Sequence, residues 1–267
     1  KGSVMENDVA AITCFLNFEN DSDKVNNFIK FKERLKEQGV PLFVIEVVPE
    51  GNIPDLSKIC GEQYFLERVL LPILIKGNAL NVLSSKVPKK YKKIAWLNSD
   101  VLISDNDWAE KASTLLEEHK LVRLNRELKH ESPAVVNRDF FEDVGIFDLD
   151  LCGETDLITH LCSINHDLLF DEKDLLDLYN ENNLNIFYKI LSYRDRCYNY
   201  FEEDIKFLDM KIETLPKKKD PPLEESIKLL KKIDIDSNIH YEHIHKIIAI
   251  KNIHGLGYRD KMLSLFK

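Results

Sequence analysis

The sequence predicts an α/β fold, with a mainly parallel sheet flanked by helices and a helical extension at the C-terminal end. Apolar runs of strand length alternate with segments of helical period as far as about Asp156, an order typical of βαβ units. Residues 42–48 are almost continuously apolar, as strands buried on both faces of a parallel sheet are. Beyond Phe170 the pattern becomes acidic and helical, which predicts the extension.

The first three elements follow from apolar spacing and from capping residues. Residues 9–15 are apolar and suit a first strand. Residues 21–23, Asp-Ser-Asp, can cap a helix, and Gly39 stands where a C-terminal glycine ends one. Residues 42–48 then form the second strand, which completes the first β-α-β unit.

The next elements continue this alternation. Pro72 suits the first turn of a second helix, which leads to a strand that ends on Asp100. Residues 108–118 have the period of a third helix, and residues 121–124 suit a further strand. We therefore expect helices on both faces of the sheet, because each one connects two parallel strands.

The last third of the chain differs from the rest. Four of its segments have helical period, the first acidic and the second aromatic and charged: residues 171–187, 193–208, 224–233 and 258–266. We accordingly divide the chain into an α/β core, residues 1–170, and a helical region packed on it, residues 171–267.

Composition argues against several classes of protein. A chain of 267 residues with 44% hydrophobic content can bury a substantial core. Its net charge of −9 disfavours nucleic acid as a partner. No apolar stretch approaches the about 20 residues of a transmembrane segment. The five cysteines are scattered and form no CxxC pair, which predicts reduced thiols and a cytoplasmic location.

The most informative stretch is residues 94–100, Ile-Ala-Trp-Leu-Asn-Ser-Asp, where an apolar run ends in polar residues. Open α/β sheets hold ligands at the carboxyl ends of their strands. Asn98 and Asp100 are two apart, so in an extended chain both side chains leave the same face. One can then contact a sugar or nucleotide while the other binds a divalent cation. An ordinary strand followed by an Asx-type turn is the alternative interpretation.

Six segments share the order and spacing of one known family: residues 11–17, 42–48, 76–81, 95–103, 137–148 and 153–156. Together they resemble the GT-A glycosyltransferases, especially family-2-like members from bacteria and large viruses. The resemblance covers roughly residues 9–165. It implies a GT-A-like, Rossmann-like core, which agrees with the predicted order of strands and helices.

The resemblance also implies a nucleotide-sugar donor site. In the family the first strand leads to the base, the acid of the second strand approaches base or ribose, and a Lys-x-x-x-Leu-Asn helix runs beside the nucleotide. The implied residues are Thr13, Phe15, Asn17, Glu46, Lys76, Asn81, Asn98 and Ser99, with Lys251 and Arg259 near the C-terminus. The last two would pair with diphosphate oxygens.

A divalent cation, Mn²⁺ or Mg²⁺, is implied as the cofactor, because it neutralises the charge that builds up on the leaving diphosphate. Asp100 is the implied ligand, whereas Asn98 stands where the family usually has the first acid of Asp-x-Asp. An amide contributes no charge to such a site. The family often adds a C-terminal histidine, for which His243 and His245 are the candidates, and their spacing alone fixes no geometry.

The acceptor side of the resemblance lies between residues 137 and 156. A helix from Arg138 is expected to end at Gly145. If the reaction inverts configuration, Asp156 would be the general base that takes the proton of the acceptor hydroxyl. Glu154 is the alternative base, or a group that binds acceptor hydroxyls. Both acids can equally be capping residues in the first turn of a helix.

The function predicted from these residues is a glycosyltransferase of the hexosyltransferase type. It would move a sugar from a nucleoside diphosphate, expected to be UDP, to a glycan, protein or small-molecule acceptor. One alternative is a catalytically silent GT-A-like protein that binds nucleotide or acts as a scaffold, which Asn98 favours. The other is a nucleotidyltransferase, against which the acidic, glycine-free residues 17–21 count.

Overall fold

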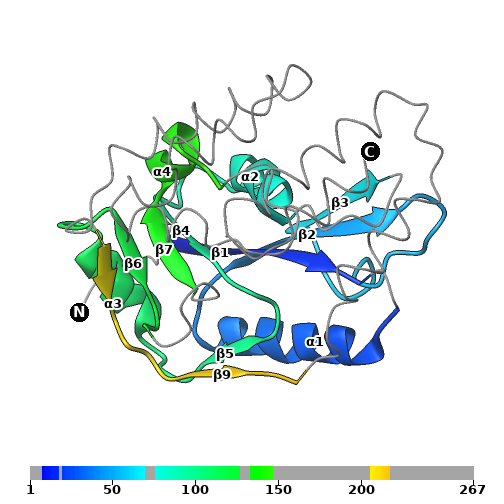
Figure 1. Ribbon diagram of the computed structural model, residues 1–267, viewed down its shortest axis with the longest axis horizontal. Helices are drawn as coiled ribbons and strands as arrows, with labels where there is room; N and C mark the ends of the chain where they lie inside the picture. Colours follow the sequence, from blue (N-terminus) through cyan, green and yellow to red (C-terminus); the bar gives the residue numbers. More distant parts are fainter. Residues whose placement is uncertain (1–7, 18–19, 70–75, 127–132, 147–204, 217–267) are drawn as a thin grey trace, which may run out of the picture.

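The computed structural model describes residues 8–17, 20–69, 76–126, 133–146 and 205–216. Within these ranges it contains a main sheet and a small sheet (Figure 1). Across the main sheet the strands are, in order, β3 (Tyr64–Val69), β2 (Leu42–Pro49), β1 (Val9–Leu16), β4 (Lys93–Trp96), β7 (Ala134–Asn137), β6 (Leu121–Arg123) and β8 (Ile205–Phe207). The small sheet pairs β5 (Val101–Ile103) with β9 (Ile212–Thr214).

The main sheet is mainly parallel, as the sequence predicts. Strands β1, β2, β3 and β4 pair in parallel, and so do β6 and β8. Both neighbours of β7 pair with it antiparallel, so among the described strands of the main sheet only β7 runs against the others. The carboxyl ends of the remaining strands therefore lie along one edge, where open α/β sheets bind ligands.

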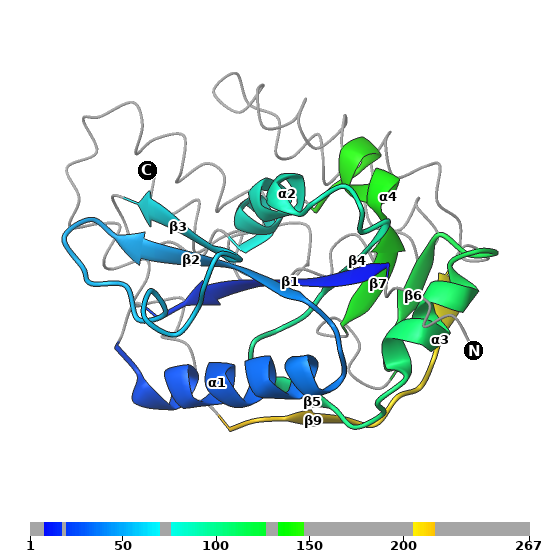
Figure 2. The ribbon, with the colours of Figure 1, turned by 180° about the vertical axis from the view of Figure 1, so that it is seen from behind.

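Helices cover both faces of the sheet, which confirms the predicted layers. The two ribbon views show α1 (Ser22–Glu37) on one side and α2 (Lys76–Lys86) with α4 (Arg138–Asp143) on the other (Figures 1 and 2). Helix α3 (Trp108–Leu115) lies beside the end of α1, where the Trp108 indole N–H donates to Gln38 Oε1 at 3.0 Å. The aromatic side chains Phe28 and Phe31 of α1 share one hydrophobic core with Trp108.

Helix α1 begins and ends where its capping residues predict. Asp21 is the N-cap, and its carboxylate accepts a hydrogen bond from the backbone N–H two residues further on. At the other end the N–H of Val40 donates to the carbonyl of Leu35, and Gly39 N–H donates to Lys36. This is a Schellman motif. Gly39 has φ +69°, a conformation that glycine adopts without steric cost.

Three strands of the main sheet were not predicted from the sequence, and one predicted helix is wrong at its end. Strand β3 is an edge strand with several exposed side chains, so it lacks an apolar run. Strand β7 is only four residues long. Residues 205–207, expected to be helical, form β8 beside β6. Pairing with an existing sheet edge overrides helical period in so short a segment.

The segment 208–216 connects distant parts of the molecule, as its path in Figure 2 shows. Its Met210 N–H donates to Leu124 O at 2.7 Å, and Leu215 N–H donates to Asp100 O at 2.7 Å. Its end is held by α1, because Asn27 Nδ2 donates to Pro216 O at 2.8 Å. Segment 208–216 thus joins the end of β6, the small sheet and α1.

Residues 205–216 fall within the region predicted to be helical and packed on the core, yet β8 belongs to the main sheet. The division at residue 170 stays a prediction, because most of the chain beyond it lies outside the described residues. In the part of the chain that the structure describes, no helix is both long and apolar enough to cross a membrane.

We predict that Gly39→Ala lowers the free energy of unfolding by about 1 kcal/mol, because an L-residue is disfavoured at positive φ. No atom lies within 4 Å of the added Cβ, so the cost is purely conformational. Urea unfolding measures it. Gly61→Ala is the matched control, since that glycine also has open space and no positive φ. Equal stability of the two variants would contradict the prediction.

Candidate functional site

The strand order places a switch point at the carboxyl ends of β1 and β4. From β1 the chain passes through α1 on one face to β2 on one side, whereas α2 on the opposite face leads to β4 on the other side. At such a point two connections diverge, and open α/β sheets bind ligands there. The residues that follow β1 and β4 are therefore the first candidates for a functional site.

Residues 98–100 form a turn, which corrects the predicted strand end. Strand β4 ends at Trp96, although Leu97 still pairs with β1 through its N–H, which donates to Ile12 O at 3.0 Å. The N–H of Val101 then donates to Asn98 O at 3.3 Å. The expectation of an extended chain with Asn98 and Asp100 on one face is wrong, because the chain must leave the main sheet here to begin β5.

Lys76, the first residue of α2, reaches this turn from the face of the sheet opposite α1. Its ammonium group donates a hydrogen bond to Asn98 Oδ1, so the start of α2 lies against the end of β4. Asn98 and Ser99 are half-buried, and Asp100 is buried with its carbonyl oxygen bonded to Leu215 N–H. The structure thus brings four of the predicted residues, Lys76, Asn98, Ser99 and Asp100, to one place.

These groups suit a phosphate ligand better than a metal ion coordinated by protein side chains alone. The Lys76 ammonium can donate to phosphate oxygens, and Asp100 supplies one carboxylate. Among the described residues no cluster of three or more His, Cys, Asp or Glu side chains could hold a metal ion. A cation held by Asp100 would therefore take further ligands from a bound phosphate and from water, as Mg²⁺ commonly does.

Thr13 and Phe15, both expected in the donor site, have side chains within the protein. The Thr13 hydroxyl donates to Leu97 O at 2.7 Å and is fully buried. The Phe15 ring packs edge-on against Phe28, with ring centroids 5.5 Å apart. Burial also raises the pKa of the neighbouring Cys14 thiol to about 12, so this group is a neutral thiol near pH 7.

Asn17 organises the loop that follows β1. Its Oδ1 accepts the N–H of Asp21 at 2.8 Å, and its Nδ2 donates to Asp55 Oδ2 at 2.7 Å. Asn17 therefore links the N-cap of α1 to the loop after β2. Asp55 is half-buried at this edge and was not anticipated from the sequence, because nothing in its neighbours marks it as close to Asn17.

Glu46 uses its carboxylate to hold the loop after β2. It is 2% exposed and accepts hydrogen bonds from the N–H groups of Asp55 and Leu56, at 2.6 and 3.1 Å, and from the Tyr64 hydroxyl at 2.6 Å. Burial, and then the bond to Glu46, raise the pKa of Tyr64 above its usual value. The expected approach of Glu46 to a base or ribose stays a prediction, and Asp55 is the more exposed acid.

Asn81 holds the turn that follows α4. Its Oδ1 accepts the N–H of Ile146 at 2.7 Å, and its Nδ2 donates to the carbonyl oxygen of the same residue at 2.5 Å. Gly145, with φ +67°, lies so close that an added Cβ would be 3.0 Å from Asn81 Oδ1. Helix α4 ends at Asp143, two residues before Gly145, where the sequence places the end.

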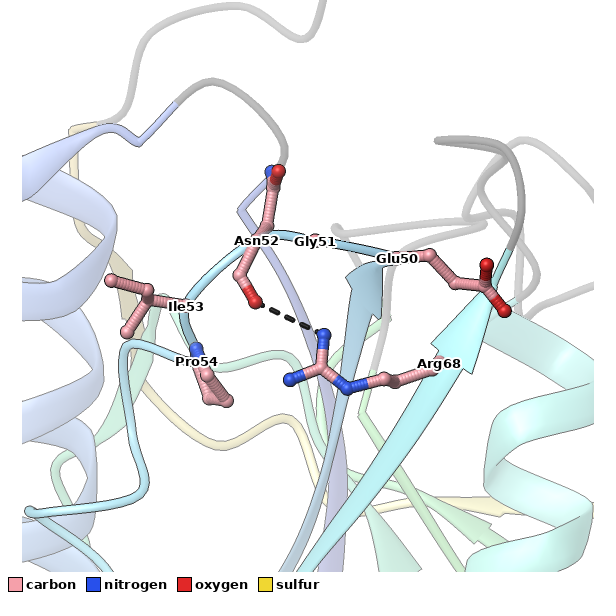
Figure 3. A pocket seen from close by; sticks show the side chains of 6 residues that line it. All are labelled: Glu50, Gly51, Asn52, Ile53, Pro54 and Arg68. Atoms are coloured by element: carbon pink, nitrogen blue, oxygen red, sulfur yellow. Dashed lines mark hydrogen bonds between the residues drawn. The ribbon is translucent and has the colours of Figure 1, made fainter.

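A hollow of about 540 Å³ lies beside the carboxyl ends of β2 and β3 (Figure 3), lined by Glu50, Gly51, Asn52, Ile53, Pro54 and Arg68. Arg68 Nη1 donates to the carbonyl of Asn52 at 3.0 Å, which ties the guanidinium group to the loop. Ile53 is 86% exposed. The sequence predicts a loop here but not the hollow, because Arg68 comes from the unpredicted strand β3.

The remaining predicted site residues lie outside the described residues. They are the two acids of the acceptor region, the two histidines proposed as metal ligands and the two basic residues near the C-terminus: Glu154, Asp156, His243, His245, Lys251 and Arg259. Their roles stay predictions.

No protein-family model matches the chain, and no curated protein matches its sequence. Similar solved structures include TarS 1–349 of S. aureus in complex with UDP-GlcNAc, with 10% identity, 96% of this chain and 75% of TarS covered, and a TM-score of 0.49. Glucosyl-3-phosphoglycerate synthase of Mycobacterium tuberculosis, in complex with Mg²⁺ and UDP, has 12% identity and a TM-score of 0.43. The match covers 82% of this chain and 73% of that protein.

A nucleotide-diphospho-sugar transferase of Desulfovibrio desulfuricans has 14% identity and a TM-score of 0.36; the match covers 49% of this chain and spans 63% of that protein's length. All three likenesses have TM-scores below 0.5, and they assign neither an activity nor a ligand of those proteins to this chain.

The Tyr64→Phe variant tests the bond to Glu46 through its pH dependence. The folded-state pKa of Tyr64 is raised above 10.0. The protonated hydroxyl therefore stabilises the folded protein in full below pH 10, and this stabilisation is lost as the pH rises towards the folded-state pKa. We expect Tyr64→Phe to be less stable than wild type by about 1 kcal/mol at pH 8, with a smaller difference above pH 10. Urea unfolding across this range measures it.

Tyr91→Phe, which also removes a tyrosine hydroxyl but one outside this network, serves as the control for the loss of a hydroxyl as such at pH 8. A stability difference between wild type and Tyr64→Phe that is constant from pH 8 to pH 11 would refute the role given to the hydroxyl.

The Asn81→Ala variant should lower the free energy of unfolding by about 2–3 kcal/mol, because it leaves two buried backbone groups of Ile146 without partners. Ser85→Ala, on the same helix but exposed, is the control and should change stability little. Urea unfolding and nucleotide titration are measured on both. A loss of nucleotide affinity at unchanged stability would instead show that Asn81 contacts the donor.

Proposed function

We propose that the protein transfers a sugar from a nucleoside diphosphate, with UDP as the expected nucleotide, to an acceptor. The observation that carries the proposal is the contact between Lys76 and Asn98 at the switch point of the sheet. It places a cation, an amide and the Asp100 turn where open α/β sheets hold ligands. A diphosphate is the ligand that this combination of charges suits best.

The nucleoside would lie across the carboxyl end of β1. Neighbouring strands are about 4.8 Å apart, so the ends of β4 and β2 are separated by roughly 10 Å. The diphosphate would bind beside Lys76, and the base would reach the hollow of Figure 3. There the Arg68 guanidinium and the apolar Ile53 offer surfaces on which a planar base can stack.

Asp100 would hold Mn²⁺ or Mg²⁺ with oxygens of the diphosphate, and the cation would neutralise the leaving group. Asn98 would contribute a neutral oxygen at most, and the Lys76 ammonium would supply part of the positive charge. Beyond the described residues, His243 or His245 would complete the metal site, and Lys251 and Arg259 would bind diphosphate. Asp156, or Glu154, would take the acceptor's proton.

The silent GT-A-like alternative has one observation in its favour. The Asn98 oxygen, at the position where the family usually carries an acid, accepts a hydrogen bond from Lys76. A cation on the protein in that place can substitute for a metal ion in binding a nucleotide. Such a protein would bind the donor without needing metal and would not turn it over.

Calorimetric titration with UDP, GDP and their sugar conjugates, first with Mn²⁺ and then with chelator, tests the proposal. We expect metal-dependent binding of one conjugate. Lys76→Met should weaken binding by about tenfold or more, because it removes a charge-assisted hydrogen bond. Asp100→Asn should abolish the metal dependence and, in a sugar-transfer assay, the turnover.

The matched controls are Lys86→Met at the other end of α2 and Asp105→Asn in the loop after β5, and both should bind like wild type. Metal-independent binding without turnover would identify the silent alternative. Absence of binding to any nucleotide would refute the proposal.

A further inference from the structure

A second hollow, of about 390 Å³, lies at the far end of the ligand edge, where β6 and β8 end. Its lining combines two bases, one acid, an amide and an apolar residue: Asn125, Arg126, Asp209, Met210 and Lys211. The donor site described above uses none of them. Strands β4 and β6 are two positions apart in the sheet, so this hollow lies roughly 10 Å along the edge from the end of β4.

The backbone of this hollow is held in place on two sides. Met210 N–H donates to Leu124 O at 2.7 Å, and Asn125 Nδ2 donates back to Met210 O at 2.8 Å. The next residue, Lys211, accepts the N–H of Ser104 at its carbonyl, at 3.1 Å. A wall tied to β6 and to the small sheet is preorganised, so a ligand would not have to order it.

The charges of the hollow favour an anion. Arg126 and Lys211 are two cations against one carboxylate, Asp209, in a chain whose net charge is −9. The Arg126 guanidinium is centred 4.6 Å from the Phe207 ring, which restricts its position. It also forms an ion pair of 3.5 Å with Asp209. An exposed pair of this kind is weak, so an anionic ligand can compete with the carboxylate for the guanidinium.

The chain turns at Asp209, which lies between Phe207, whose ring packs against Arg126, and Met210, whose backbone forms the wall. Asp209 has φ +51°, in the left-handed region that Asp and Asn adopt more often than other non-glycine residues.

We propose that this hollow binds a phosphate group, and that the group belongs to the acceptor. The planar fork of Arg126 matches two phosphate oxygens, and Lys211, also in the lining, contributes a second positive charge. The identification with the acceptor rests on the proposed function, because it places the acceptor beside a donor at β1 and β4. The binding of phosphate itself does not depend on it.

Titration of the full chain with inorganic phosphate, followed by NMR or calorimetry at low and constant ionic strength, tests the proposal. Arg126→Gln and Lys211→Gln should each weaken phosphate binding by about tenfold, the effect of losing one charge-assisted hydrogen bond. Lys206→Gln, an exposed lysine of β8 outside the lining, is the control and should bind like wild type. Equal affinity in all four proteins would overturn the proposal.

Asp209→Asn gives a test in the opposite direction. It removes the competing carboxylate and keeps a residue that tolerates positive φ, so phosphate should bind more tightly than to wild type. Unchanged or weaker binding would contradict the role given to Asp209.

UDP titrations of the same variants separate the two proposals. If UDP fails to bind while phosphate binding responds as expected, the donor function is wrong and the phosphate site stands. If UDP binds to the wild type and more weakly to Lys76→Met, while phosphate binding does not respond to Arg126→Gln or Lys211→Gln, the phosphate site is wrong and the donor function stands. A parallel loss of UDP and phosphate in Arg126→Gln would place the phosphate group in the donor and overturn its assignment to the acceptor.

Discussion

The pairing of β1 with β4 is the constraint on which the site depends. Strand β1 is almost completely buried, so both of its edges must be hydrogen-bonded, one to β2 and the other to β4. The pairing continues through Leu97, which the Thr13 hydroxyl also bonds. Beyond this point the chain leaves for a second sheet, so the polar residues that follow form a turn.

The polar residues at this edge divide into two groups by what their side chains contact. Glu46 and Asn81 satisfy backbone groups of neighbouring segments, and buried groups of that kind are costly to leave unpaired. Lys76 and Asn98 contact each other from different elements. The first group gives the edge its shape, and the second provides the charge and hydrogen-bonding capacity that a phosphate ligand requires.

Segment 208–216 has a part in both proposed sites. Its N-terminal half forms the wall of the basic hollow, and its C-terminal half bonds the backbone of Asp100. Because Asn27 of α1 holds its end, the segment connects the proposed phosphate hollow to the Asp100 turn through a continuous backbone. This arrangement depends on residues that are more than a hundred positions apart in the chain.

The amino-acid sequence by itself determined the alternation of strands and helices, the cap and end of α1, and the presence of polar residues after β4, because apolar period and capping are local properties. Only the tertiary structure decided that Asn98 and Asp100 lie in a turn, that residues 205–207 join the sheet, and that Glu46 faces inward. It also decided that Arg68 and Asp55 lie at the ligand edge. These outcomes depend on which segments meet across the sheet, and no local pattern specifies such a contact.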